Sequence, residues 1–184
     1  MSDCTATLLE FAPFKRRRVV SDFSGGEVSS DGGLLLLRQL EPRIGLLERA
    51  AAVISDPRDP ERIQHRLVDM LKQRVFGLCL GYEDLNDHNE LRRDVLLQTT
   101  VERDTPLASA PTLCRLENRA SRAVAWRQHE VIVERLIASF REAPREVVVD
   151  FDAAKHARAI LALPVKRLRH EWPPVKIIER ADAG

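Results

Sequence analysis

Three aspartates stand where two short apolar runs end. The stretch "EVVVDFD" places Asp150 and Asp152 after three valines, and Asp182 follows "VKIIERA" near the end of the chain. Short β-branched runs of this kind are typical of buried strands. Because residues two apart on a strand lie on the same face, Asp150 and Asp152 are expected to share one face.

The segment between the two runs predicts how these carboxylates meet. Residues from about 154 to 171 have a helical pattern, so we expect a strand over 146–151, a helix, and a second strand over 175–179 in a right-handed parallel crossover. Both strands then end at one sheet edge, where open α/β sheets bind ligands. Converging carboxylates favour Mg²⁺, and two such ions would assist phosphoryl transfer. An aspartate at a strand end is also often a helix cap or a solvated charge, and spacing alone does not distinguish these cases.

The preceding residues are predicted to be mainly helical. A chain of 184 residues with 44% hydrophobic content can form one core and a small second unit. Alternating residues predict a β-hairpin near 16–30, and helices follow, the first interrupted at Pro42 and Gly45. We therefore expect an α+β protein, with a mostly helical, DNA-binding N-terminal region over 1–143 and a β-α-β fragment over 144–184.

The cellular compartment is predicted from composition and the first residues. Three widely spaced cysteines, an odd number without a C-x-x-C pair, suit a reducing environment. The N-terminus lacks the charge order of a secretory signal, and no apolar run approaches the length of a membrane span. We expect a soluble, cytoplasmic protein without a membrane partner. The net charge of +1 makes any argument for a polyanionic partner depend on local clusters.

Basic residues gather in three places and are candidates for contact with DNA phosphates. One group lies at the start of the predicted hairpin, and one lies in "APTLCRLENRAS", which could be a helix-turn-helix element. The third lies on the predicted helix after Asp152. The candidates are Lys15, Arg16, Arg17 and Arg18; Arg115, Asn118, Arg119 and Arg122; and Lys155, Arg158, Lys166, Arg167 and Arg169. Such charges are also common on solvated faces, so both interpretations remain open.

Four stretches together resemble a known family. They are "RRRVVSDFSGGEVSSDGGLLLLRQL", "PLASAPTLCRLENRAS", "PREVVVDFDA" and "AKHARAILALPVKRLRHEWPPVKIIERADAG", and they are similar to bacterial insertion-sequence transposases of the DDE type, group 1. The resemblance implies a ribonuclease-H-like catalytic domain in which two aspartates and a glutamate hold two Mg²⁺ ions that cut and rejoin DNA. Asp152 matches the first carboxylate, with Asp150 as the alternative, and Asp182 matches the second. The implied partner is double-stranded DNA at the element ends.

The chain departs from the family pattern after Asp152. In the family a long polar stretch follows and forms the next two antiparallel strands, whereas here the helix begins almost at once. The chain also ends at Gly184, before a third acidic residue, and Ala183 stands where serine is usual. We expect an internally deleted, truncated transposase that has lost catalysis. The alternative is a non-enzymatic DNA-binding remnant or a regulator that pairs with an intact transposase.

A second resemblance comes from the first motif alone. "VVVDFDA" is similar to the first motif of haloacid-dehalogenase-type phosphatases, where the first aspartate is a nucleophile and the second an acid/base. That class needs a later lysine and a complete doubly wound sheet. The residues after Asp152 are too few to form one, so this interpretation is disfavoured.

Overall fold

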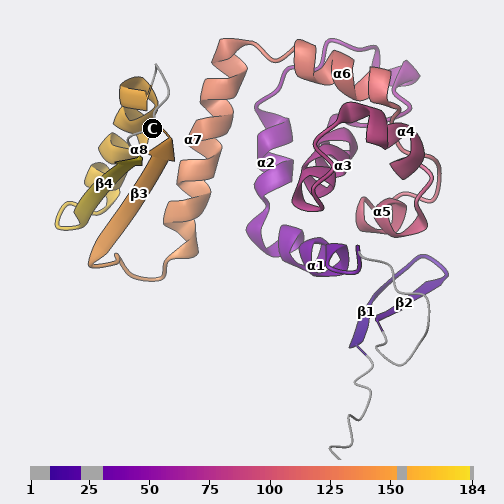
Figure 1. Cartoon of the computed structure of the whole chain (residues 1–184), viewed down its shortest axis with the longest axis horizontal. Coiled ribbons are helices and arrows are strands. Elements are labelled where there is room, and N and C mark those ends of the chain that lie inside the picture. Colours follow the sequence, from indigo (N-terminus) through magenta and orange to yellow (C-terminus); the bar gives the residue numbers. More distant parts are fainter. Residues whose placement is uncertain (1–8, 22–30, 153–156, 183–184) are drawn as a thin grey trace, which may run out of the picture. The chain divides into compact units, whose positions relative to one another are not determined.

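The computed structural model describes residues 9–21, 31–152 and 157–182, which form two compact units (Figure 1). Unit 1 is Met1–Ser121 and unit 2 is Arg122–Gly184. The elements of unit 1 are β1 (Leu9–Phe14), β2 (Arg17–Ser21), α1 (Leu34–Ile44), α2 (Leu46–Ala52), η1 (Pro60–Arg62), α3 (Leu67–Cys79), η2 (Leu85–Asp87), α4 (His88–Leu91), α5 (Val95–Thr100) and α6 (Ala110–Asn118). Those of unit 2 are α7 (Arg122–Ser139), β3 (Glu146–Asp152), α8 (Ala157–Glu171) and β4 (Lys176–Asp182). The predicted α+β class is therefore confirmed.

The N-terminal hairpin lies earlier in the chain than the sequence suggested. β1 and β2 pair antiparallel, and the tight turn between them falls at Lys15 and Arg16. Lys15 adopts the left-handed backbone with φ 53°, which lets a short turn reverse the chain. Phe14 in β1 and Val19 in β2 are the buried apolar residues of the two strands. β2 lies within the predicted range of 16–30, but its partner strand β1 precedes that range, and residues 22–30 lie outside the described part of the chain.

Helix α1 runs through Pro42 and ends at Gly45, so the predicted interruption at Pro42 was wrong and that at Gly45 is confirmed. Pro42 lies in the last turn of the helix, where its missing N–H removes a hydrogen bond only near the end. Gly45 has φ 63°, a conformation that favours glycine. The buried carboxylate of Glu41 then accepts a hydrogen bond from the backbone N–H of Leu47 at 2.7 Å, which caps the start of α2.

A buried polar network joins α3 to the segment that leads into α6. The amide of Gln73 donates to the Ala108 carbonyl at 2.9 Å and accepts from the Ala108 N–H at 3.0 Å. The Gln73 nitrogen also lies 3.3 Å from Nδ1 of His88, whose side chain is fully buried. Gly77 makes room for this ring, because a Cβ there would lie 2.8 Å from His88 Cε1. These contacts fix the start of α6 relative to α3.

In unit 2 a parallel crossover is built around α8. β3 and β4 lie side by side in parallel (Figure 1). Val147 and Ile177 are register partners that pack against buried Leu168 and Trp172. Phe140 meets Trp172 edge to face, with ring centroids 5.3 Å apart. The predicted parallel strands are thus confirmed. Within the described ranges, no helix has the length and apolar character needed to cross a membrane.

The boundary between the compact units falls at Ser121/Arg122, before α7. α7 therefore groups with the strands, because it packs on α8. The junction was predicted between residues 143 and 144, and the division into a DNA-binding region and a catalytic fragment stays a prediction.

Candidate functional site

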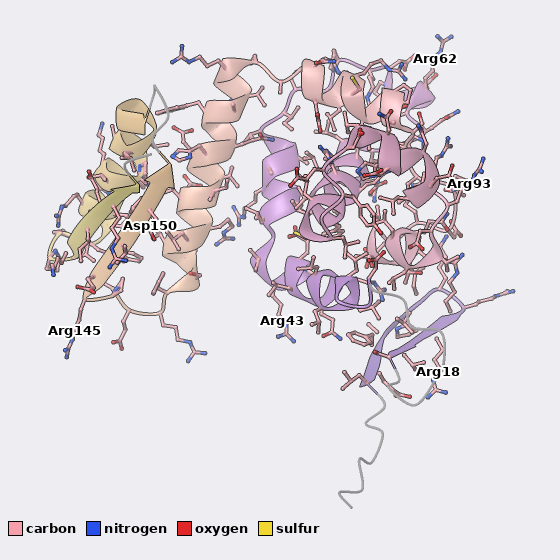
Figure 2. All side chains as sticks on the ribbon, viewed as in Figure 1. Arg18, Arg43, Arg62, Arg93, Arg145 and Asp150 are labelled. Atoms are coloured by element: carbon pink, nitrogen blue, oxygen red, sulfur yellow. The ribbon has the colours of Figure 1, made fainter. Side chains whose placement is uncertain are left out.

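The end of the parallel strand pair places two of the predicted carboxylate residues together. Asp152 and Asp182 are Cα partners in the register of β3 and β4. Asp150 instead has Arg180 as its partner, and its side chain is exposed (Figure 2). The register therefore brings Asp152, rather than Asp150, next to an aspartate of the other strand.

Two carboxylate residues at one register position are suited to a hard divalent cation. Mg²⁺ binds carboxylate oxygens and keeps several waters, so two protein ligands are enough for a single ion. Asp152 and Asp182 are the residues that could hold it. In the described part of the chain, no three histidine, cysteine, aspartate or glutamate side chains gather in a group that could hold a metal ion.

The basic residues of the hairpin are largely engaged with protein groups. Lys15 pairs with Asp104, and Arg18 pairs with Glu10. The ion pair with Lys15 lowers the pKa of Asp104. Arg17 donates to the Thr99 hydroxyl at 3.4 Å, and Arg16 is exposed in the turn. Only part of this predicted cluster is therefore available to contact DNA.

Some of the basic residues of α8 are likewise paired with protein groups, whereas others are exposed. Arg167 lies 3.7 Å from both Glu134 and Glu171, and Arg169 donates to the Val175 carbonyl. Lys166 is exposed and lines a pocket of about 260 Å³ with Arg167 and two glutamates. Lys155 lies outside the described residues, and Arg158 falls in the first turn of α8.

Unit 1 holds a larger and more basic concavity. It has a volume of about 730 Å³ and is lined by polar side chains, among them Gln64, His65 and Asn118. Five arginines contribute to it, and we call it the arginine pocket. They are Arg58, Arg62, Arg92, Arg115 and Arg119.

Two of the five, Arg115 and Arg119, were predicted DNA-binding residues. The third predicted arginine, Arg122, lies in unit 2 at the start of α7 and is exposed. Because α6 and α7 belong to different units, the predicted helix-turn-helix pairing stays a prediction.

A partly buried ion pair shapes the wall of the arginine pocket. Arg58 donates to both carboxylate oxygens of Asp56, at 2.7 and 2.6 Å, and its third nitrogen donates to the His65 carbonyl at 3.0 Å. These hydrogen bonds lower the pKa of Asp56 and raise the pKa of Arg58. Each of the three nitrogens of Arg58 therefore makes a hydrogen bond that holds the loop before α3, which indicates a structural role in the pocket.

The site residues predicted from the sequence did not include Arg58, Arg62 and Arg92. The stretch "DPRDPERIQHR" does carry an arginine every four residues, at 58, 62 and 66, which could have indicated a basic surface. Arg92 follows α4 and has no sequence neighbour in the pocket. The three residues come from separate segments, and only the tertiary structure of unit 1 brings them into one lining.

These features define an α+β protein with an arginine-rich concavity in one unit and paired aspartates on parallel strands in the other. Proteins that act on phosphodiesters carry such features.

A family model described as "Transposase DDE domain group 1" matches residues 11–157, and the chain belongs to this family. Members of the family act on DNA and use divalent metal ions. The matched region includes Asp152 and the whole arginine pocket, while Asp182 lies beyond it. No curated protein and no solved structure matches the chain.

Proposed function

We propose that this member of the DDE transposase family binds duplex DNA and keeps two aspartates of the family's active site, but does not cut DNA by itself. One observation carries the proposal. Asp152 and Asp182 share a register position, yet only residues 153–156 separate β3 from α8. The segment that the family resemblance implies between these elements, with two further strands, has no room in this connection.

The paired aspartates fit a single Mg²⁺ ion. Asp152 and Asp182 would supply one carboxylate each, and water would complete the shell. When bound, such an ion polarises a phosphoryl oxygen and stabilises developing negative charge. The two strands would hold the carboxylates in place, because α8 and the apolar partners Val147 and Ile177 fix the register.

Strand cleavage in this family requires more than one ion. The two strands that the family resemblance implies between β3 and α8 would form much of the site around such ions. The loss of a two-ion clamp should cost several kcal/mol of transition-state stabilisation. Since about 1.4 kcal/mol corresponds to a tenfold change in rate, cleavage should fall to background.

The basic side chains support the DNA-binding part of the proposal. Arg16, Arg62 and Arg115 are exposed in unit 1, and Lys166 is exposed in unit 2. Each phosphate contact releases counterions, so the affinity for duplex DNA should fall steeply with salt. With six or more contacts, a fourfold rise in salt should weaken binding by about three orders of magnitude.

Two assays on the purified full chain test this proposal. Fluorescence anisotropy of a labelled duplex, at two salt concentrations about fourfold apart, measures binding. Incubation of the same duplex with Mg²⁺ measures cleavage and strand transfer. We expect salt-sensitive binding and no product. Affinity that does not change with salt would contradict the DNA-binding part. Cleavage that disappears in both Asp152→Asn and Asp182→Asn would show that the site is completed, and would contradict the loss of catalysis.

A further inference from the structure

The arginine pocket of unit 1 has a lining unlike that of a small-molecule site. Its volume of about 730 Å³ is in the usual range for ligand pockets. Such pockets are normally lined by apolar and aromatic side chains. Among the described residues that line this one, none is aliphatic and none carries a carboxylate. The lining therefore favours an anionic ligand of considerable size.

The charges around the pocket leave a positive excess. Asp56 pairs with Arg58 and lies 3.9 Å from Arg119, and Asp59 lies 3.8 Å from Arg62. In the described ranges these two carboxylates are the acidic partners of the five arginines, so three positive charges are uncompensated. An open concavity with this charge attracts polyanions.

Arg92 is the residue that most clearly lacks a protein partner. Its Nε is buried and makes no hydrogen bond within the described structure. A buried arginine donor without a partner is costly, because its desolvation is not offset by a hydrogen bond. The backbone around Arg92 is nevertheless held firmly, since the Arg92 carbonyl accepts from the N–H of Leu107 at 2.9 Å. The side chain is thus positioned in the pocket wall without being neutralised.

The start of α6 also contributes to the lining of the pocket. Ser109 precedes this helix, and Thr112 lies in its first turn, where Arg115 donates to the Thr112 hydroxyl at 3.2 Å. The N-terminal end of a helix carries partial positive charge, which adds to that of the arginines. Arginines and a helix start in the same lining are complementary to phosphate oxygens.

We propose that the arginine pocket binds phosphate groups of the DNA backbone, with Arg92 and Arg62 as the contacting residues. The inference rests on the proposed DNA-binding function and assigns a site to it. Arg62 is 88% exposed at its side chain, so it can reach a ligand without rearrangement. Arg58 supports the wall through its bonds to Asp56 and the His65 carbonyl, and is not a contacting residue.

His65 in the pocket provides a reporter of occupancy. Burial, Arg103 and Arg92 together lower the pKa of its imidazole, while Asp69 raises it slightly and Arg58 lowers it. A phosphate bound beside it would oppose the arginine charges and favour the protonated ring. The pKa of His65, measured by NMR, should therefore rise when duplex DNA is added.

The test compares three single substitutions in the full chain by duplex-DNA anisotropy over a range of salt. Arg92→Gln and Arg62→Gln each remove one predicted phosphate contact, so each should lower the slope of log affinity against log salt by about 0.9. Each should also weaken binding by about tenfold at low salt. Arg93→Gln is the matched control, because Arg93 is adjacent to Arg92 in the sequence and is not part of the pocket lining. It should change the affinity by less than about twofold. Figure 2 labels Arg93 and the tested Arg62.

The outcomes separate this inference from the proposed function. If the wild-type chain binds DNA and the two pocket variants behave like Arg93→Gln, the pocket assignment is wrong and DNA binding stands. If the wild-type chain binds no DNA, both proposals fail. The same measurement of the His65 pKa with inorganic phosphate tests whether free phosphate, rather than the DNA backbone, is the ligand. A rise in the His65 pKa at micromolar phosphate that duplex DNA does not reproduce would overturn the DNA assignment. Because Arg62 is exposed, its variant remains informative even if Arg92→Gln unfolds.

Discussion

Asp152 and Asp182 are Cα partners at the last register position of the parallel strands β3 and β4, although the whole of α8 separates them in the sequence. The pairing follows from the crossover, in which α8 returns the chain so that both strands run in the same direction. A shift of the register by two residues would place Asp150, rather than Asp152, beside Asp182. The apolar pair Val147 and Ile177 opposes such a shift, because both pack in the core under α8.

The first prediction concerns divalent-ion binding. Mn²⁺ can serve as a paramagnetic probe for the Mg²⁺ site, and its free concentration can be followed by electron paramagnetic resonance. Asp152→Asn and Asp182→Asn should each weaken binding by about tenfold or more, since a lost charged ligand costs at least about 1.4 kcal/mol. Asp150→Asn is the matched control and should leave binding within about twofold of the wild type. A larger effect of Asp150→Asn would instead identify it as the family's first carboxylate.

The second prediction concerns the packing that holds the strands in register. Leu168 is fully buried in the core of unit 2, so Leu168→Ala should destabilise this unit by about 2–5 kcal/mol. Leu136 on α7 is 42% exposed, and Leu136→Ala should change stability by less than about 0.5 kcal/mol. Urea unfolding measures both. Equal effects of the two substitutions would mean that α8 does not pack on the strands as described.

The third prediction tests the close approach of α3 and His88. Gly77→Ala places a Cβ 2.8 Å from a fully buried ring, so it should destabilise unit 1 by about 1–3 kcal/mol. Gly33 has a helical backbone, and a Cβ added to it would meet no atom within 4 Å, so Gly33→Ala should be neutral or stabilise by about 0.4–1 kcal/mol. Thermal unfolding compares the two. A Gly77→Ala protein as stable as Gly33→Ala would disprove the contact.

The fourth prediction concerns pH. Burial is the main cause of the lowered pKa of both His88 and His65, with nearby arginines adding to it. In the unfolded chain these rings have an ordinary pKa of 6.5, so unfolding takes up protons below that pH. Stability of unit 1 should therefore be complete above pH 6.5 and fall as the pH decreases toward 5, by at most about 1.4 kcal/mol per pH unit for each histidine.

Chemical denaturation at about pH 7.5, 6 and 5 measures this dependence. The double variant His65→Gln/His88→Gln should be less stable at the highest of these pH values but should lose much less stability as the pH falls to the lowest. Asp56 does not interfere, because its lowered pKa makes its contribution disappear only at more acidic pH. A double variant with the wild-type pH dependence would exclude the two histidines as its cause.

Local patterns in the sequence were enough to predict several elements. The run of valines, the uninterrupted helical pattern and the final apolar run predicted β3, α8, β4 and their parallel pairing. Where a prediction was wrong, the local sequence signal was weak and tertiary packing determined the structure. The turn at Lys15 has no glycine, and Pro42 is accommodated because it falls in the last turn of α1. Conformational preferences of single residues are small beside the packing of Phe14 and its neighbours.

The sequence by itself determined the fold class, the strand-helix-strand order and the family resemblance, because these depend on residue types and spacing along one segment. Two properties were decided only by the tertiary structure. The register made Asp152, rather than Asp150, the partner of Asp182. The folding of unit 1 brought Arg62, Arg92 and Arg115 from three separate segments into one pocket lining. Neither the register nor the pocket could be predicted from residue spacing. A site built from distant segments depends on which apolar faces pack together, and the packing of the whole core determines this.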